Sequence, residues 1–230
     1  MFIPLYDHNK LTHVLRPFVN YSIIAANIVV FLVFQGAGAD QAVSGSALSF
    51  GLIPAVFFDI RDLAPGLQYL PDWMSILTYA FLHGSFMHLL GNMLFLWVFG
   101  DNVEDAMGHF RYLVFYLLCA MAGGYAYAIL DENSTVPLIG ASGAVSGVVA
   151  AYLILHPRVK VWGLVLGRIP LRLTARWMLG AWILFQFVNL VIAEESDTAW
   201  IAHIGGLIAG TVLVLFMRRK GVPLLDKNLS

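Results

Sequence analysis

GASGAVSG, residues 140–147, begins a long apolar run and contains no residue larger than valine. Residues this small allow a neighbouring helix to approach closely, and Gly143 and Gly147 stand four positions apart, as in close-packed membrane helices. Ser142 is then most simply explained as a packing residue. The alternative is that it is a reactive serine, and the rest of the sequence has to decide between the two interpretations.

The composition is that of a membrane protein with several spans. The 230 residues are 60% hydrophobic and 12% charged, with a mean hydropathy of +0.79, above the usual range of soluble domains. A helix needs about 20 apolar residues to cross a hydrocarbon core about 30 Å thick. We therefore predict an all-α bundle of six transmembrane helices, formed by a single domain over residues 1–230 with its core at about 20–218. The six runs are 20–36, 85–103, 110–130, 140–155, 176–193 and 200–217.

The distribution of charge predicts the orientation of this bundle. Short inner loops of membrane proteins are rich in Lys and Arg. With both termini inside, twelve of the 13 Lys and Arg residues lie on the inner side, and Arg61 alone lies outside. Nine of the 14 Asp and Glu residues then lie outside. We expect a multi-pass protein with cytoplasmic termini and no removable signal peptide, and the minimal six-span form favours a bacterial inner membrane.

Two segments are neither clear spans nor short loops. Residues 38–84, on the outer side, contain apolar stretches broken by Pro54, Pro65 and Pro71, so we expect this loop to lie partly submerged against the bundle. The inner segment, RVKVWGLVLGRIPLRLTAR from Arg158 onward, alternates basic with apolar residues. We expect it to rest on anionic lipid headgroups.

Polar side chains occur at one depth in three of the predicted helices. The second, fourth and sixth runs all begin at the outer face, and Ser85 is a plausible N-cap for the second. They carry His88 and Asn92, Ser142, and His203, each within roughly 10 Å of the outer boundary at 1.5 Å per residue.

Each of these residues also has a simpler explanation. Asn92 could form only an interhelical hydrogen bond, and His88 lies near enough to the interface for a structural role. His83, in a predicted loop, is more simply structural. An ionisable group within a membrane is costly, which favours a function for His203. Gly206 and Gly210 follow His203, and with Gly143 and Gly147 they predict close contact between the fourth and sixth helices.

At this point the sequence resembles the rhomboid family of intramembrane serine proteases, over about residues 50–210. The motifs are FGLIP from Phe50, HGSFMHLLGNM with His88 and Asn92, GDNVEDAMG, GASG around Ser142 and AHIGG around His203. The resemblance implies that Ser142 is the nucleophile and His203 its general base. It assigns His88, Asn92 and the backbone N–H of Ser142 to the oxyanion site, and structural roles to Glu104 and Gly108.

The sequence departs from the family pattern at two positions. Many members carry Trp-Arg where this chain has Trp73-Met74, and many carry tyrosine beneath the histidine ring where this chain has Ser146. The second difference leaves open which group holds the ring of His203.

The chemistry that the resemblance implies is hydrolysis by a serine that a neutral imidazole activates. We expect no Asp or Glu inside any of the six spans, and therefore a Ser–His dyad rather than a triad, with more weight on donors at the oxyanion. The runs also lack the pair of acids of an aspartyl protease, and none of the seven histidines begins an HExxH motif.

The expected partners are transmembrane protein substrates, cleaved near their outer ends, and membrane lipids. We expect no cofactor, no metal and no nucleic acid, and the sequence does not predict the oligomeric state. Cys119 is expected to be a small buried hydrophobe. The alternative function is a catalytically silent rhomboid-like factor that binds or handles membrane proteins. A small transporter would need polar groups at the midplane of the membrane, which we do not find.

Overall fold

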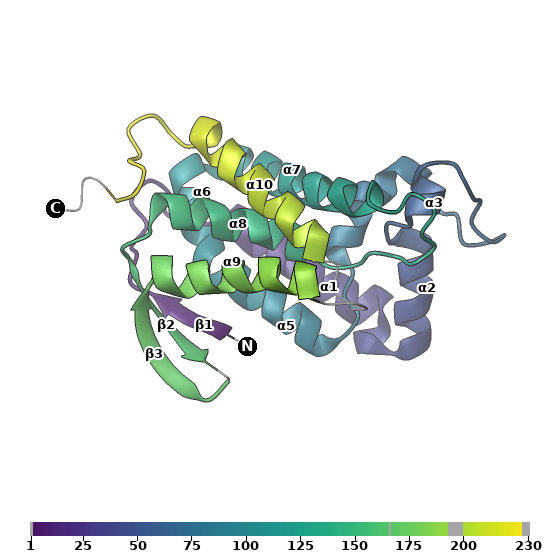
Figure 1. Ribbon diagram of the computed structural model, residues 1–230, viewed down its shortest axis with the longest axis horizontal. Coiled ribbons are helices and arrows are strands. Elements are labelled where there is room, and N and C mark those ends of the chain that lie inside the picture. Colours follow the sequence, from purple (N-terminus) through teal and green to yellow (C-terminus); the bar gives the residue numbers. More distant parts are fainter. Residues whose placement is uncertain (1, 166, 193–199, 227–230) are drawn as a thin grey trace.

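The computed structural model describes residues 2–165, 167–192 and 200–226, and most of them are helical. The longer helices lie roughly along the long axis of the molecule, with α2 across one end (Figure 1). Their bounds are α1 Phe18–Val29, α2 Asp40–Phe50, α5 Phe86–Phe95, α6 Asp101–Met107, α7 His109–Ala128, α8 Ser142–Leu155, α9 Ala175–Ile192 and α10 Trp200–Met217.

Short elements connect or extend these helices. A π-helical segment continues α1, and another joins α5 to α6, so that one long helical element runs from Phe86 to Met107. The short elements are π segments Val30–Phe34 and Leu96–Gly100, 3₁₀ turns Gly36–Gly38, Asp72–Met74 and Tyr79–Phe81, and helices α3 Pro54–Phe57 and α4 Ser75–Thr78.

Helices lie over all six predicted apolar runs. By length and composition α9 and α10 can each cross a membrane, and a third candidate pairs Asp72–Phe81 with Phe86–Met107 across a bend of 82°. Phe18–Phe34 and α8 are shorter apolar helices. The mostly helical membrane fold is therefore as predicted, while the number of six spans and the depth of the outer loop remain predictions.

Helix α8 lies at the centre of the bundle and is almost entirely buried. It packs against α7 and α10. Its C-terminal half contributes the fully buried side chains of Val148, Tyr152 and Leu155 to the main core. Cys119 of α7 is fully buried against the same helix, as predicted. Ser142, the first residue of this helix, is partly buried at its N-terminal end.

A three-stranded antiparallel sheet corrects the prediction of an all-α fold. Strands β1 (Phe2–Asp7), β2 (Lys160–Val165) and β3 (Ile169–Thr174) pair in the order β1-β2-β3. The alternation of basic and apolar residues in 157–175 has the period of two that is typical of a strand, but we interpreted it as an amphipathic membrane segment. Trp162 and Arg172 are cross-strand partners, with the guanidinium 5.8 Å from the ring centre.

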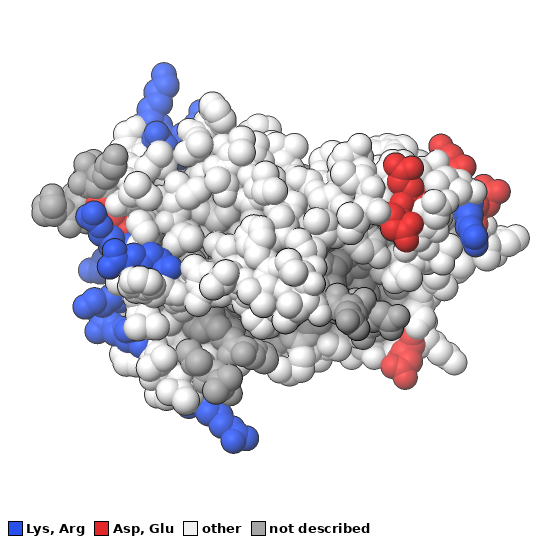
Figure 2. All heavy atoms as spheres, viewed as in Figure 1, with Lys and Arg blue, Asp and Glu red and all other residues white. Residues whose placement is uncertain are grey.

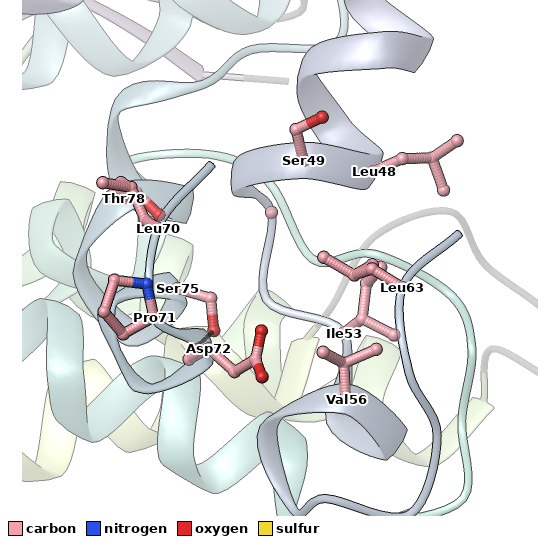
Figure 3. A pocket seen from close by; sticks show the side chains of 11 residues that line it. Leu48, Ser49, Ile53, Val56, Leu63, Leu70, Pro71, Asp72, Ser75 and Thr78 are labelled. Atoms are coloured by element: carbon pink, nitrogen blue, oxygen red, sulfur yellow. Dashed lines mark hydrogen bonds between the residues drawn. The ribbon is translucent and has the colours of Figure 1, made fainter. Parts of the chain in front are cut away.

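The segment at the opposite end packs against the bundle. Leu52 pairs with Leu138 by backbone hydrogen bonds, and the buried hydroxyl of Tyr79 donates to the carbonyl of Ala120 in α7 at 2.7 Å. A small pocket of about 20 Å³ lies within this segment, lined by residues that include Ile53 and Asp72 (Figure 3). These contacts hold the segment that precedes α5 against the helix bundle.

The charged residues separate along the long axis. Lys and Arg gather at the end that carries the sheet, and most of the visible Asp and Glu lie at the other end (Figure 2). This separation of Lys and Arg from most Asp and Glu agrees with the uneven distribution of charge that the sequence predicts between the two sides. Of the residues used in that prediction, Glu194, Glu195, Asp197 and Lys227 lie outside the described residues, as does position 193 at the end of the fifth run.

Candidate active site

Ser142 is the first residue of α8, at a turn that glycine makes possible. Gly140 has a φ of +127°, a conformation that side-chain-bearing residues rarely adopt, and its N–H donates to the carbonyl of Tyr79 at 2.9 Å. The N–H groups of the first turn of a helix have no partner within the helix, and the helix dipole is positive there. Ser142 therefore lies where a developing negative charge is favoured.

The imidazole of His203 lies directly against this serine. His203 is in the first turn of α10 and is 8% exposed, and its Nε2 is 2.8 Å from Oγ of Ser142. The two residues are 61 positions apart in the chain. A hydroxyl at hydrogen-bond distance from an imidazole nitrogen is the geometry in which histidine can remove the serine proton.

The other side of the imidazole is bonded to a residue that we did not predict. Nδ1 of His203 is 2.8 Å from Oε1 of Gln186 in α9, and Gln186 is 2% exposed. The indole of Trp200 contacts the imidazole edge to face, with ring centres 5.7 Å apart. Gln186 and Trp200 thus occupy the role that the sequence left open at Ser146.

Ser146 itself makes a local bond within α8. Its Oγ donates to the carbonyl of Ser142 at 2.7 Å, and its side chain is fully buried. This is the i−4 bond that serine commonly forms inside helices. Ser146 therefore contacts the backbone of Ser142 and leaves the serine hydroxyl to His203.

His88 reaches the space in front of Ser142. A Cβ placed on Gly140 would lie 2.7 Å from Nε2 of His88 and 3.7 Å from Oγ of Ser142, so both groups border one small space that the glycine leaves open. Nδ1 of His88 accepts the N–H of Gly84 at 3.5 Å. With Nδ1 accepting, Nε2 carries the ring proton and can donate into that space.

Asn92 lies one turn further along α5 and is held by a second histidine. Its Nδ2 is 3.0 Å from Nε2 of His83, which is fully buried. Gln35 holds the backbone of His83 from both sides, accepting its N–H at 2.8 Å and donating to its carbonyl at 3.0 Å. One amide hydrogen of Asn92 is thereby oriented, and the second remains available as a donor. Ser85 caps α5 as predicted, accepting the N–H of His88 at 3.2 Å.

Glycines set the distance between α8 and α10. A Cβ on Gly206 would overlap the carbonyl oxygen of Gly143, and a Cβ on Gly210 would overlap that of Gly147. Only glycines allow this approach, which confirms the predicted contact between the fourth and sixth helices. Because serine and histidine side chains are short, the dyad distance depends on it.

Sequence reasoning missed Gln186, and it named His83 as structural without predicting its burial or its bond to Asn92. The signal for Gln186 was a lone amide in the apolar run WILFQFVNLV, since polar groups within membrane helices are costly and pair with one another. The expectation of no acid inside the spans was wrong at one position, because Asp101 lies near the C-terminal end of the second run, as the first residue of α6. Among the described residues the hydrogen bonds of the His203 ring go to Ser142 and Gln186.

The resemblance implies structural roles for Glu104, which lies in the middle of α6, and for Gly108, which follows its C-terminal end. The carboxylate of Glu104, fully buried, accepts the N–H groups of Val19 and Asn20 in the first turn of α1. Gly108 has a φ of +84° and separates α6 from α7. The two residues thus hold the start of α1 and the turn into α7.

These features define the class of the protein: a mostly helical membrane protein in which a serine and a histidine meet at the N-terminal ends of two apolar helices. The chain belongs to the rhomboid family, because the family model described as the Rhomboid domain matches residues 70–220. Rhomboid-family members are integral membrane proteins, typically serine intramembrane proteases.

Individual relatives are moderately similar. Rhomboid-like protein 11, chloroplastic, of Arabidopsis thaliana is 25% identical over 194 residues, which cover 76% of this chain and 64% of that protein. Rhomboid protease GlpG of Yersinia pseudotuberculosis serotype I (strain IP32953) is 27% identical over 152 residues, 66% of this chain and 50% of that protein. GlpG of Yersinia pestis (strain Pestoides F) matches to the same extent. The chain thus spans less than two thirds of the length of these relatives.

Proposed function

We propose that this chain is an intramembrane serine endopeptidase that cleaves transmembrane segments of membrane proteins by a Ser142–His203 dyad. The observation that carries the proposal is the 2.8 Å contact between Oγ of Ser142 and Nε2 of His203, each at the beginning of an apolar helix. A packing serine needs no imidazole at this distance. Membership of the rhomboid family supports the same reaction.

The reaction proceeds in two halves. Oγ of Ser142 attacks the carbonyl carbon of the scissile peptide while its proton moves to Nε2 of His203. The tetrahedral intermediate collapses when His203 gives that proton to the departing amine, which leaves an acyl-enzyme. Water then gives its proton to His203 and attacks the ester carbonyl. When the second intermediate collapses, His203 gives its proton to Oγ of Ser142, and the new carboxyl end of the substrate is released.

Three donors serve the oxyanion of both intermediates in this proposal. They are the N–H of Ser142, Nε2–H of His88 and the free amide hydrogen of Asn92. The backbone donor is strengthened by the dipole of α8. Each such donor is worth roughly 2.7–4 kcal/mol where it has been measured, which matters more here because the His203 ring is bonded to a neutral amide instead of a carboxylate.

The substrate and the side of attack follow from where the polar groups lie. Ser142, His203 and His88 are all at helix ends on the predicted outer side, so water enters from there and the substrate helix is cut near its outer end. A helix must unwind to expose a peptide bond, and small or helix-breaking residues make this easier. We place the protein in a bacterial inner membrane with both termini cytoplasmic.

A catalytically silent rhomboid-like factor is the alternative function. It would use the same glycine packing to bind membrane proteins, but it would not need Ser142, His203 and Gln186 in one hydrogen-bonded row. The bonding of His203 to both neighbours favours the protease. The two functions differ in whether Ser142 can be acylated.

The test is labelling of the purified chain with a serine-directed fluorophosphonate probe. We expect labelling of the wild type, none of Ser142→Ala, and near-normal labelling of the matched control Ser146→Ala, one turn deeper in α8. Cleavage of a transmembrane peptide substrate should follow the same order and should be insensitive to chelators. Cleavage by purified Ser142→Ala at the wild-type rate, or absence of labelling in a folded wild type, would contradict the proposal.

A further inference from the structure

A row of hydrogen bonds joins the backbone of α9 to the hydroxyl of Ser142. Nε2 of Gln186 donates to the carbonyl of Trp182 at 3.3 Å, and Oε1 of Gln186 is 2.8 Å from Nδ1 of His203. Nε2 of His203 is 2.8 Å from Oγ of Ser142. Gln186 and His203 are 2% and 8% exposed, so water does not replace these bonds.

The direction of every bond in this row follows from its first acceptor. A backbone carbonyl can only accept, so the group of Gln186 that faces Trp182 must be the NH₂. The amide oxygen then faces His203, and because an amide oxygen also only accepts, Nδ1 of His203 must carry the ring proton. In a neutral ring Nε2 is therefore the lone-pair nitrogen, and it can take the proton of Ser142.

The reversed arrangement would be unproductive. If the Gln186 amide were turned, its oxygen would lie 3.3 Å from the carbonyl oxygen of Trp182, and the two oxygens would repel each other. The NH₂ would then donate to Nδ1 of His203, and the ring proton would move to Nε2, pointing at the serine oxygen. A histidine in that tautomer cannot act as the base.

We infer that Gln186 is a positioning residue that holds His203 in the tautomer with its proton on Nδ1. The inference deepens the proposed protease function and rests on it. Gln186 acts only through His203, doing with a neutral amide what a carboxylate does in a serine–histidine–acid triad. Trp200, edge to face with the ring, limits its rotation while Gln186 determines which nitrogen is protonated.

The α9 helix supplies a matched control for this residue. Asn189, three positions further on, also donates its side-chain amide to the carbonyl four residues earlier, Phe185, at 2.7 Å. Asn189 is partly exposed, and its bond involves neither residue of the dyad. Replacing each amide by leucine therefore removes the same kind of helix bond, but only Gln186→Leu removes the acceptor of Nδ1–H.

The first measurement is steady-state cleavage of a transmembrane peptide substrate by the full chain in detergent. We expect Gln186→Leu to lower kcat by roughly 10²-fold, less than the ~10⁴-fold cost of a wrong tautomer in a charged triad, with KM unchanged because Gln186 does not touch substrate. Asn189→Leu should keep wild-type kcat and KM. Gln186→Glu should restore most of the activity, because a protonated carboxyl donates to Trp182 and still offers an oxygen to Nδ1–H.

The second measurement reads the tautomer directly, by ¹⁵N NMR of protein labelled at histidine. The His203 signals are assigned as those missing from His203→Ala. We expect a protonated Nδ1 and an unprotonated Nε2 in the wild type and in Asn189→Leu, and a shift toward protonated Nε2 in Gln186→Leu. A change of packing alone would leave the tautomer as it is.

The outcomes separate this inference from the proposed function. If the wild type cleaves, Ser142→Ala does not, and Gln186→Leu keeps both its kcat and the Nδ1-protonated tautomer, the positioning role is overturned while the protease stands. If Ser142→Ala cleaves like the wild type, the proposed function fails first. A Gln186→Leu chain with lowered thermal stability is judged on the NMR tautomer and on the rescue by Gln186→Glu.

Discussion

Gly206 of α10 lies so close to Gly143 of α8 that a Cβ on the first would overlap the carbonyl oxygen of the second. The same relationship recurs one turn further, between Gly210 and Gly147. The small residues of GASGAVSG thus form a packing surface, and that surface is what brings His203 to within 2.8 Å of Ser142. The packing interpretation and the chemical interpretation of this stretch are compatible.

Gly206→Leu should separate α8 from α10. No rotation of the new side chain avoids the backbone of Gly143, so we expect a loss of about 3 kcal/mol of stability from overpacking and a fall in cleavage as the dyad lengthens. Thermal unfolding and peptide cleavage in detergent measure both effects. The control is Gly180→Leu in α9, where a Cβ meets nothing within 4 Å. Wild-type stability of Gly206→Leu would contradict the close packing.

Asn92→Ala should lower turnover by roughly 10²–10³-fold, the cost of losing one oxyanion donor. Labelling by the fluorophosphonate probe should continue at a reduced rate, because Ser142 and His203 are untouched. Thermal unfolding of the variant checks that the pocket around His83 remains intact. Full turnover in a folded variant would limit Asn92 to its hydrogen bond with His83.

Asp7 makes stability depend on pH at the end of the molecule that carries the sheet. Burial raises the pKa of Asp7 from 3.8 to about 6, and its hydrogen bond from the Tyr152 hydroxyl only partly opposes this effect. Between these two pKa values the folded chain holds a proton that the unfolded chain has released. Stability should therefore fall as the pH rises from about 4 to 6 and stay lower above that range.

Asp7→Asn should remove the contribution of this residue to the pH dependence, because an amide does not titrate. We expect the variant to be more stable than the wild type at pH 7.5, by up to about 3 kcal/mol at 1.36 kcal/mol per pKa unit, and to differ little from it at pH 4. Thermal unfolding at both pH values gives the comparison. The exposed acid Asp59, replaced by asparagine, serves as the control. Equal stability of Asp7→Asn and wild type at pH 7.5 would exclude the effect.

The orientation is tested by cysteine accessibility in a Cys119→Ala background. A cysteine at position 62 or 132 should react with a membrane-impermeant maleimide added to intact cells, because the acidic end is predicted to be outside. A cysteine at position 160 or 220 should react only after the membrane is opened. The reverse pattern would place Ser142 and His203 at the inner face and overturn the proposed entry of water and substrate.

Much of the helical architecture could be predicted because the bilayer imposes a simple rule. Long apolar runs, glycines four positions apart and the asymmetry of Lys and Arg are local patterns that a single sequence displays. The common depth of Ser142 and His203 followed from counting residues along the runs. Each of these inferences needed only the position of a residue within its own helix.

The remaining features depend on contacts between distant segments. Strand β1 pairs with β2 across more than 150 residues, and nothing local in FIPLYD indicates that partner. Gln186 contacts His203 because of the rotation of α9 about its axis, which an apolar run with weak periodicity does not determine. The burial of His83 depends on Gln35, which lies 48 positions earlier in the chain.

The three side chains in the row from Gln186 through His203 to Ser142 come from three successive helices, and the base is on the last of them. During synthesis the chain emerges with its N-terminal part first, so Ser142 is made well before His203. A growing chain that already contains the serine has neither its base nor the amide that orients that base. In the proposed mechanism the nucleophile therefore has no base until α10 has been made, and a chain that ends before α10 cannot cleave a peptide bond.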